Sequence, residues 1–193
     1  MNMPPGESEA AERQALLALD RGDRKAALTL LMESYGAALY RYCRQLTADD
    51  DLAQDVHQLT FVKAYEDLNR FARRSSLRTW LYGIARHRCL DALKQKRRRE
   101  RRFELVEEPP EQCDATADAE AQLTARDLSR VLDKCLERLA PQIRAAVLLR
   151  YREGFSYPDM ARICRERSAT LQMRVRRALP LLRRCLEEHG VSP

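Results

Sequence analysis

The chain has 193 residues and a formal net charge of +6, so it can hold one domain or two small ones, and its charge favours a polyanionic partner. It contains only 6 glycines, 33% of its residues are charged, and no long stretch alternates apolar and polar residues, which argues against a strand-rich fold. No apolar run approaches the roughly 20 residues of a membrane span. The composition predicts an all-α protein without membrane insertion, and the acidic start of the chain does not resemble a secretory signal.

Helical periodicity begins near residue 10, after a leader (residues 1–11) that we expect to be disordered. A polar break at residues 20–23 separates a short first helix from a second over residues 24–46. The second helix carries an apolar stripe formed by Leu28, Leu31, Tyr35, Leu39 and Tyr42. These two helices open the first predicted domain.

A third helix is expected after Thr47, the predicted N-cap, with acidic residues 49–51 in its first turn, where the helix dipole favours carboxylates. Its predicted buried stripe consists of Leu52, Val56, Leu59 and Val62. After a loop at residues 69–75, a fourth helix is expected over about residues 76–99. The first domain is therefore placed at residues 12–99.

The chain changes character at residues 104–120, which are acidic, contain a proline pair and lack an apolar stripe. We predict a flexible acidic linker over residues 100–123. Helical periodicity then returns in residues 124–188, followed by a short tail at 189–193. The predicted architecture is two small helical domains joined by this linker.

In the second domain, one helix is expected near residues 123–139 and another from Pro141 to Tyr151. Residues 155–165 and 169–179, separated by a short turn, have the lengths of a helix-turn-helix, whose second helix enters the DNA major groove. On this second helix the predicted inward residues are Leu171, Val175, Ala178 and Leu182, and the predicted outward residues are Ala169, Gln172, Met173, Arg176 and Arg177. Arginine and glutamine can contact guanine and adenine edges, so this helix is a candidate DNA reader.

Two further charge patterns lie in the first domain. The basic run at residues 94–102 can neutralise phosphates, although it could equally be a solvated tail. Asp51, Asp55 and Gln58 recur on one helix face. They suit a basic protein partner, although an ordinary exposed face would look the same.

The six cysteines (Cys43, Cys89, Cys113, Cys135, Cys164 and Cys185) are spread along the chain without a Cys-x-x-Cys pair. This spacing predicts reduced thiols in a cytoplasmic protein, not a disulfide framework or a zinc knuckle. Most of them fall on apolar stripes, where a small buried residue is the usual role. We therefore expect no metal and no cofactor.

Several segments resemble parts of sigma factors. Residues 51–65 (DLAQDVHQLTFVKAY) resemble their polymerase-docking segment, and residues 70–86 (RFARRSSLRTWLYGIAR) resemble their promoter-melting segment. Residues 148–157 and 170–178 resemble their second DNA-binding domain. Over about residues 24–186 the chain is similar to the extracytoplasmic-function (ECF) sigma factors, the two-domain branch of the sigma-70 family.

The resemblance implies a non-enzymatic factor that directs core RNA polymerase to promoters. It implies docking on the clamp helices of the largest subunit and on the flap. It also makes an anti-sigma factor an expected partner. The implied polymerase-binding residues are Asp51, Asp55, Gln58 and, beneath them, Phe61. The implied −10 residues, which would capture a single strand with one base turned out, are Asn69, Arg70, Phe71, Arg73, Arg74, Ser75, Ser76, Arg78, Thr79, Trp80, Arg86 and His87. The implied −35 residues are Ser168, Ala169, Thr170, Gln172, Met173, Arg174, Arg176 and Arg177. Phosphate contacts are implied for Lys94, Lys96, Arg97 and Arg98.

The chain departs from the family pattern at three positions. Arg165 stands where a turn glycine is usual, Pro180 should kink the last helix or end it near residue 179, and His87 replaces the usual asparagine. Two other classes of protein stay open. A free-standing helix-turn-helix regulator would not need residues 51–65 and 77–86 together, and a nuclease would need a convincing cluster of metal-binding carboxylates or histidines.

Overall fold

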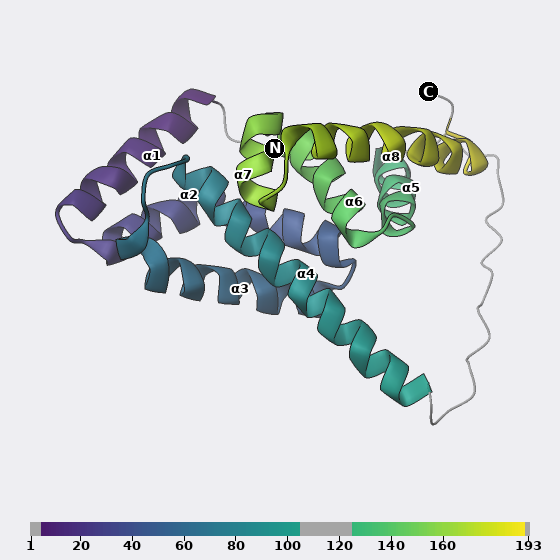
Figure 1. Ribbon diagram of the computed structural model, residues 1–193, viewed down its shortest axis with the longest axis horizontal. Helices are drawn as coiled ribbons and strands as arrows, with labels where there is room; N and C mark the ends of the chain where they lie inside the picture. The colour runs from purple at the N-terminus through teal and green to yellow at the C-terminus, as the bar shows by residue number, and fades with distance from the viewer. Residues whose placement is uncertain (1–4, 105–124, 192–193) are drawn as a thin grey trace.

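The computed structural model describes residues 5–104 and 125–191, and within these ranges the chain is helical, as predicted (Figure 1). The first half contains α1 (Pro5–Asp20), α2 (Arg24–Thr47), α3 (Asp50–Asp67), the 3-10 turn η1 (Leu68–Arg70) and α4 (Leu77–Glu104). The second half contains α5 (Ala125–Glu137), α6 (Pro141–Val147), the π-helical turn η2 (Leu148–Arg152), α7 (Tyr157–Cys164) and α8 (Ser168–Glu188). No helix in these ranges is both long and apolar enough to cross a membrane.

The first domain packs α1–α4 around the predicted stripe of α2. Leu31, Leu39 and Tyr42 are at most 1% exposed, and they meet Leu77 and Leu81 of α4 in one core. Each fully buried side chain of this size contributes about 1.5–3 kcal/mol. This core fixes the face that each helix leaves to solvent.

Three predicted boundaries in the first domain are wrong. Helix α1 starts at Pro5, so residues 5–11 are not a disordered leader. Asp49, not Thr47, caps α3 by accepting a 2.9 Å hydrogen bond from the Leu52 N–H, whereas Thr47 ends α2 and donates its hydroxyl to the Cys43 carbonyl. Helix α4 continues to Glu104, past the predicted end near residue 99, and the rest of the predicted linker, residues 105–123, lies outside the described residues.

The buried stripe of α3 also differs from the prediction. Leu59 and Val62 are 51% and 55% exposed, whereas the buried residues are Ala53, Val56, Thr60, Phe61 and Ala64. Thr60 is tolerated in the core because its hydroxyl donates to the Val56 carbonyl at 2.7 Å. The helix is rotated relative to the predicted stripe, which leaves two apolar side chains on its surface.

The predicted helix-turn-helix is present in the second domain. The Ser156 hydroxyl caps α7 by accepting a hydrogen bond from the Asp159 N–H. Arg165 ends the helix in the left-handed conformation (φ 55°, ψ 41°), as expected at a position where a turn glycine is usual. Helix α8 does not end near residue 179: it continues through Pro180 to Glu188. Pro180 has no N–H to donate to the carbonyl of Arg176, one turn earlier in the helix. Both residues are exposed, so water can reach that carbonyl.

The cysteine prediction is wrong in part. Cys135 of α5 and Cys185 of α8 form a disulfide across a sequence separation of 50 residues. The helices that carry them pack side by side, and no local spacing could indicate this. Cys43, Cys89 and Cys164 are free, as expected, and all three are buried, as predicted for Cys43 and Cys164; Cys113 lies outside the described residues.

The two halves of the chain pack against each other, with α7 lying on α4 and with α5 and α6 near the end of α2 (Figure 1). Gly83 of α4 lies so close to α7 that an added Cβ would sit 3.9 Å from the Ile163 backbone. At the other end, the Arg144 guanidinium donates to the Leu46 carbonyl at 3.1 Å. The fold therefore places the second domain over one face of α4.

Candidate protein and nucleic-acid interfaces

Helix α3 presents the predicted docking residues on its open face. Asp51, Asp55 and Gln58 are exposed, and Phe61 is 5% exposed beneath them. Leu59 and Val62, which were predicted to be buried, lie on the same exposed face because positions 55, 58, 59 and 62 share one side of a helix. Carboxylates next to uncovered apolar side chains favour a protein partner over DNA.

The loop between η1 and α4 is shaped by α1, a helix for which the sequence indicates no function. Glu12 of α1 accepts a 2.7 Å hydrogen bond from the Leu77 N–H at the start of α4, and Arg73 forms an ion pair with Asp20. Arg73 is left-handed (φ 54°). The loop conformation therefore depends on contacts with α1 as well as on its own sequence.

The predicted −10 residues of this loop are open to solvent for the most part. Phe71 and Ser75 are half-buried, and the Phe71 ring packs at a tilt of 54° against Trp80 of α4, with 5.4 Å between centroids. The exposed members of the set are Asn69, Arg70, Arg73, Arg74, Ser76 and, on α4, His87. This surface combines arginines with an accessible aromatic pair, the combination that single-stranded nucleic acid uses for backbone contacts and base stacking.

Two other predicted −10 residues, Arg78 and Arg86, lie at the boundary between the domains, and a third, Thr79, is buried in α4. Arg78 donates to the Glu153 carbonyl at 2.5 Å, and Arg86 pairs with Glu166 at 3.4 Å. These side chains do not share the open surface of residues 69–76 in this arrangement.

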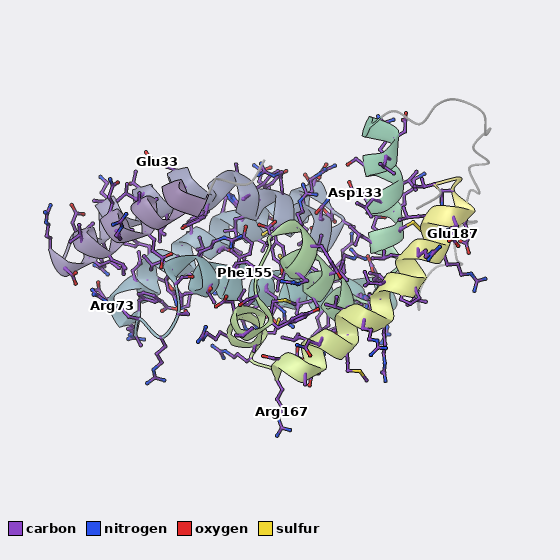
Figure 2. The ribbon with its side chains drawn as sticks, turned by 90° about the horizontal axis from the view of Figure 1, so that it is seen from above. Glu33, Arg73, Asp133, Phe155, Arg167 and Glu187 are labelled. Carbon is purple, nitrogen blue, oxygen red and sulfur yellow. A yellow bond between two sulfur atoms is a disulfide. The ribbon has the colours of Figure 1, made fainter. Side chains whose placement is uncertain are left out.

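Helix α8 has the two faces predicted for a DNA-reading helix. Leu171, Val175, Ala178 and Leu182 are at most 7% exposed. The exposed residues of its first half are Ala169, Thr170, Gln172, Met173, Arg176 and Arg177. Figure 2 shows Arg167, immediately before the helix, extending away from the body of the protein.

Two predicted −35 residues are less accessible. Ser168 is half-buried and donates to the Tyr157 carbonyl at 3.3 Å. Arg174 is half-buried and donates two hydrogen bonds, of 2.9 and 2.6 Å, to the Glu166 carboxylate. A bidentate arginine–carboxylate pair fixes the guanidinium and neutralises its charge.

The C-terminal turns of α4 project beyond the packed body and carry the predicted phosphate-contacting residues (Figure 1). Lys94, Lys96, Arg97 and Arg98 are all exposed. The Lys96 ammonium lies 2.7 Å from Asp49 at the start of α3, which raises the lysine pKa. The ammonium of Lys96 is therefore paired, which reduces its availability to phosphate.

An apolar groove of about 970 Å³ in the second domain was not anticipated from the sequence. Its walls come from α5, η2 and α8, with Leu132, Tyr151 and Leu179 at least 38% exposed. An amphipathic helix from another protein would fit such a groove.

Two family models match this chain, one in each half. The chain matches Sigma-70 region 2 over residues 31–99 and Sigma-70 region 4 over residues 129–182. It is 32% identical over 178 residues to the ECF RNA polymerase sigma factor SigC of Mycobacterium tuberculosis (strain CDC 1551 / Oshkosh), and the match covers 92% of each chain. The chain belongs to the ECF sigma factors.

Other similar proteins agree with this assignment. The ECF RNA polymerase sigma-E factor of Haemophilus influenzae is 28% identical over 182 residues, which cover 91% of this chain and 95% of the relative. The sigma factor RpoE of Bartonella quintana, solved in complex with the anti-sigma factor NepR, is 28% identical with a TM-score of 0.63, covering 81% of this chain and 94% of the other. CnrH, solved in complex with the cytosolic domain of CnrY, shares the fold with a TM-score of 0.63 at 23% identity, covering 94% and 97%.

This ECF sigma factor is thus an alternative sigma factor that directs transcription initiation. Its region 2 match spans α3 and most of α4, and its region 4 match contains the helix-turn-helix. The structure adds how these two regions contact each other.

Glu153 is central to that contact. Its side chain is 2% exposed, and one carboxylate oxygen accepts a 2.5 Å hydrogen bond from the Tyr82 hydroxyl of α4. The Arg78 guanidinium stacks 4.0 Å from the Phe155 ring centroid, and the Phe155 and Tyr82 rings pack edge to face at 5.0 Å.

Burial alters the acid–base chemistry of this contact. Desolvation raises the pKa of Glu153 above its ordinary value, although the Tyr82 hydrogen bond and Arg78 act in the opposite direction. Desolvation, together with the neighbouring Glu153 charge, also raises the pKa of Tyr82, so its hydroxyl stays protonated and can donate. The buried carboxylate therefore prefers to be protonated more than a solvated one does.

Proposed function

We propose that α3 is the surface through which this sigma factor docks on core RNA polymerase, with the clamp helices of the largest subunit as the partner. Asp51, Asp55 and Gln58 would supply the polar contacts, and Phe61 would support them from the core. The observation that supports this most is the exposed acidic face of α3 in a chain whose net charge is +6. The exposed Leu59 and Val62 add an apolar component to the same interface.

The test is the affinity of the full chain for core polymerase. Asp55→Ala should weaken binding by at least about tenfold, because a carboxylate that pairs across a desolvated interface is worth more than about 1.4 kcal/mol. Glu33→Ala, an exposed carboxylate on α2 labelled in Figure 2, is the matched control and should bind like the wild type. Equal affinity of the Asp55→Ala variant and the control would remove α3 as the docking surface.

The loop at residues 69–76 and the start of α4 would capture the −10 element as single-stranded DNA. The Phe71–Trp80 pair is available for stacking, which compensates part of the few kcal/mol needed to turn a base out of the duplex. Arg78 and Arg86 can join this surface only after the second domain moves off α4, because Glu153 and Glu166 hold the two arginines. Thr79 would support the loop from a buried position, where its hydroxyl accepts a hydrogen bond from Ser76. The arrangement described here is therefore assigned to the sigma factor before it binds a promoter.

The second domain would read the −35 element through the first half of α8. Gln172, Arg176 and Arg177 are the exposed side chains suited to base edges or phosphates, and Ala169, Thr170 and Met173 lie beside them. Ser168 and Arg174 would act from partly buried positions. Lys94, Lys96, Arg97 and Arg98 would neutralise phosphates without reading sequence.

We assign the apolar groove of the second domain to a helix of a protein partner, either the polymerase flap or an anti-sigma factor. The similar sigma factors RpoE and CnrH were solved with NepR and with the cytosolic domain of CnrY, respectively. Regulation of this chain by an anti-sigma factor follows by similarity. The factor would work in the cytoplasm, on the nucleoid when bound to polymerase, and would perform no catalysis itself.

A further inference from the structure

The disulfide between α5 and α8 lies next to a histidine. Cys135 and Cys185 are 1% and 5% exposed, and half-buried His189 follows Cys185 by one helical turn. One ligand atom from each of the three residues lies within 4.8 Å of the other two. That spacing allows a single metal ion to reach all three, since zinc binds sulfur at about 2.3 Å and nitrogen at about 2.0–2.1 Å.

The histidine is also oriented by its surroundings. Its Nδ1 lies 2.8 Å from the Cys185 carbonyl oxygen, so an N–H at Nδ1 donates to that carbonyl and Nε2 keeps its lone pair. Metal-binding histidines usually donate their other ring N–H in this way, which fixes the tautomer and the ring orientation. This hydrogen bond also caps the last turn of α8, and it leaves Nε2 as the ring nitrogen that can bind a metal.

We propose that Cys135, Cys185 and His189 form a redox-controlled zinc site. The disulfide is the oxidised form. A dithiol reductant transfers two electrons and two protons to it, and the dithiol itself becomes a disulfide while Cys135 and Cys185 become thiols. Zn²⁺ then binds both sulfurs and the imidazole and displaces the two thiol protons. Among the described residues no fourth Cys, His, Asp or Glu belongs to this group, so a water completes the tetrahedron.

Zinc suits this ligand set better than harder cations. Thiolate and imidazole ligands select zinc, whereas magnesium and calcium prefer oxygen. The other described thiols belong to no such group with a histidine: a hydrogen bond with Cys43, together with burial, raises the pKa of Cys89, and burial raises that of Cys164.

The site joins two walls of the apolar groove. Leu132 and Leu136 of α5 line one wall, and Leu182 and Leu186 of α8 line the other. In the disulfide the sulfurs are bonded, whereas two thiolates on a tetrahedral zinc lie about 3.8 Å apart. Exchange between the disulfide and the zinc-bound form therefore shifts α5 against α8. Reduction without zinc leaves the α5 and α8 walls of the groove without a covalent or metal link.

The test uses the full-length protein and zinc itself. The protein is reduced with excess dithiol, freed of reductant without oxygen and titrated with Zn²⁺ against a chromophoric chelator. We expect one tightly bound zinc per chain, with release on oxidation as the Cys135–Cys185 peptide pair reappears in mass spectra. Co²⁺ in place of zinc should give the sulfur-to-metal charge-transfer band of a thiolate site. Reduced wild-type protein that binds no zinc, or Co²⁺ without that band, overturns the proposal.

Variants locate the site. Cys135→Ser should abolish tight binding, and His189→Ala, a change at the end of α8, should weaken it by at least about tenfold. Cys164→Ser removes a buried thiol elsewhere and should leave one zinc bound. Zinc binding that survives Cys135→Ser, or that is lost with Cys164→Ser while helicity is retained, contradicts the assignment. None of these measurements involves polymerase or DNA, so they stand apart from the proposed docking surfaces.

Discussion

The contact between Tyr82 and Glu153 allows a direct test of whether the two domains pack together in solution. The Tyr82 hydroxyl donates a 2.5 Å hydrogen bond to a carboxylate that is 2% exposed. A hydrogen bond to a charged group contributes about 1.5–3 kcal/mol net. Tyr82→Phe removes only the hydroxyl and should shift the balance toward separated domains by about 10- to 150-fold.

A double-mutant cycle measures the coupling free energy of the pair. It uses urea unfolding of the wild type, Tyr82→Phe, Glu153→Ala and the double variant at about pH 8, where a carboxylate tends to ionise. We expect a coupling of about 1.5–3 kcal/mol. Tyr151→Phe, whose ring is exposed, should change the free energy of unfolding by less than about 0.5 kcal/mol. A Tyr82–Glu153 coupling below about 0.3 kcal/mol would mean that the packed arrangement is not the populated one.

Three further outcomes are expected. Because the Glu153 pKa is raised in the packed state, that state binds the proton more tightly, so domain packing should strengthen as pH falls from the raised pKa toward the ordinary value of 4.5. Intrinsic amide exchange itself slows as pH falls, so the measure is the protection factor of α4 and α7 relative to the intrinsic rate at each pH; protection that is unchanged or lower at the lower pH would contradict this. Arg165→Gly should raise the free energy of unfolding by about 1 kcal/mol, because glycine adopts the left-handed backbone of this position without strain. Arg167→Gly, at a position with φ −71°, should give no such gain. Equal urea midpoints for Arg165→Gly and the wild type would refute strain at Arg165. Arg97→Ala/Arg98→Ala should lower the slope of log K against log salt for promoter DNA by about 1.8; an unchanged slope would show that these arginines do not contact phosphates.

The inner faces of α2 and α8 could be predicted because a helix that packs on one side repeats its buried residues with a fixed period. Leu171, Val175, Ala178 and Leu182 followed that period and are all buried. On α3 the same reasoning failed at Leu59 and Val62, since periodicity cannot distinguish an apolar residue of the core from one left on the surface.

Contacts between distant segments were outside the reach of the sequence. The Cys135–Cys185 bond depends on how α5 packs on α8, and the Tyr82–Glu153 bond, between residues 71 positions apart, depends on how the second domain packs on α4. Local chemistry was ambiguous at the start of α3, where Thr47 and Asp49 are both good capping residues two positions apart. The general location of the candidate surfaces was predictable, but the partners that restrain Arg78, Arg86 and Arg174 were not.

Run-off transcription with purified core polymerase tests the account most directly. Promoter fragments are transcribed at moderate salt with the wild-type chain, with Asp55→Ala and with Glu33→Ala. The account predicts discrete transcripts that depend on the wild-type chain, persist with Glu33→Ala and fall sharply with Asp55→Ala. Binding of duplex DNA without any redirection of core polymerase would contradict it, and the second domain would then serve a free-standing helix-turn-helix regulator.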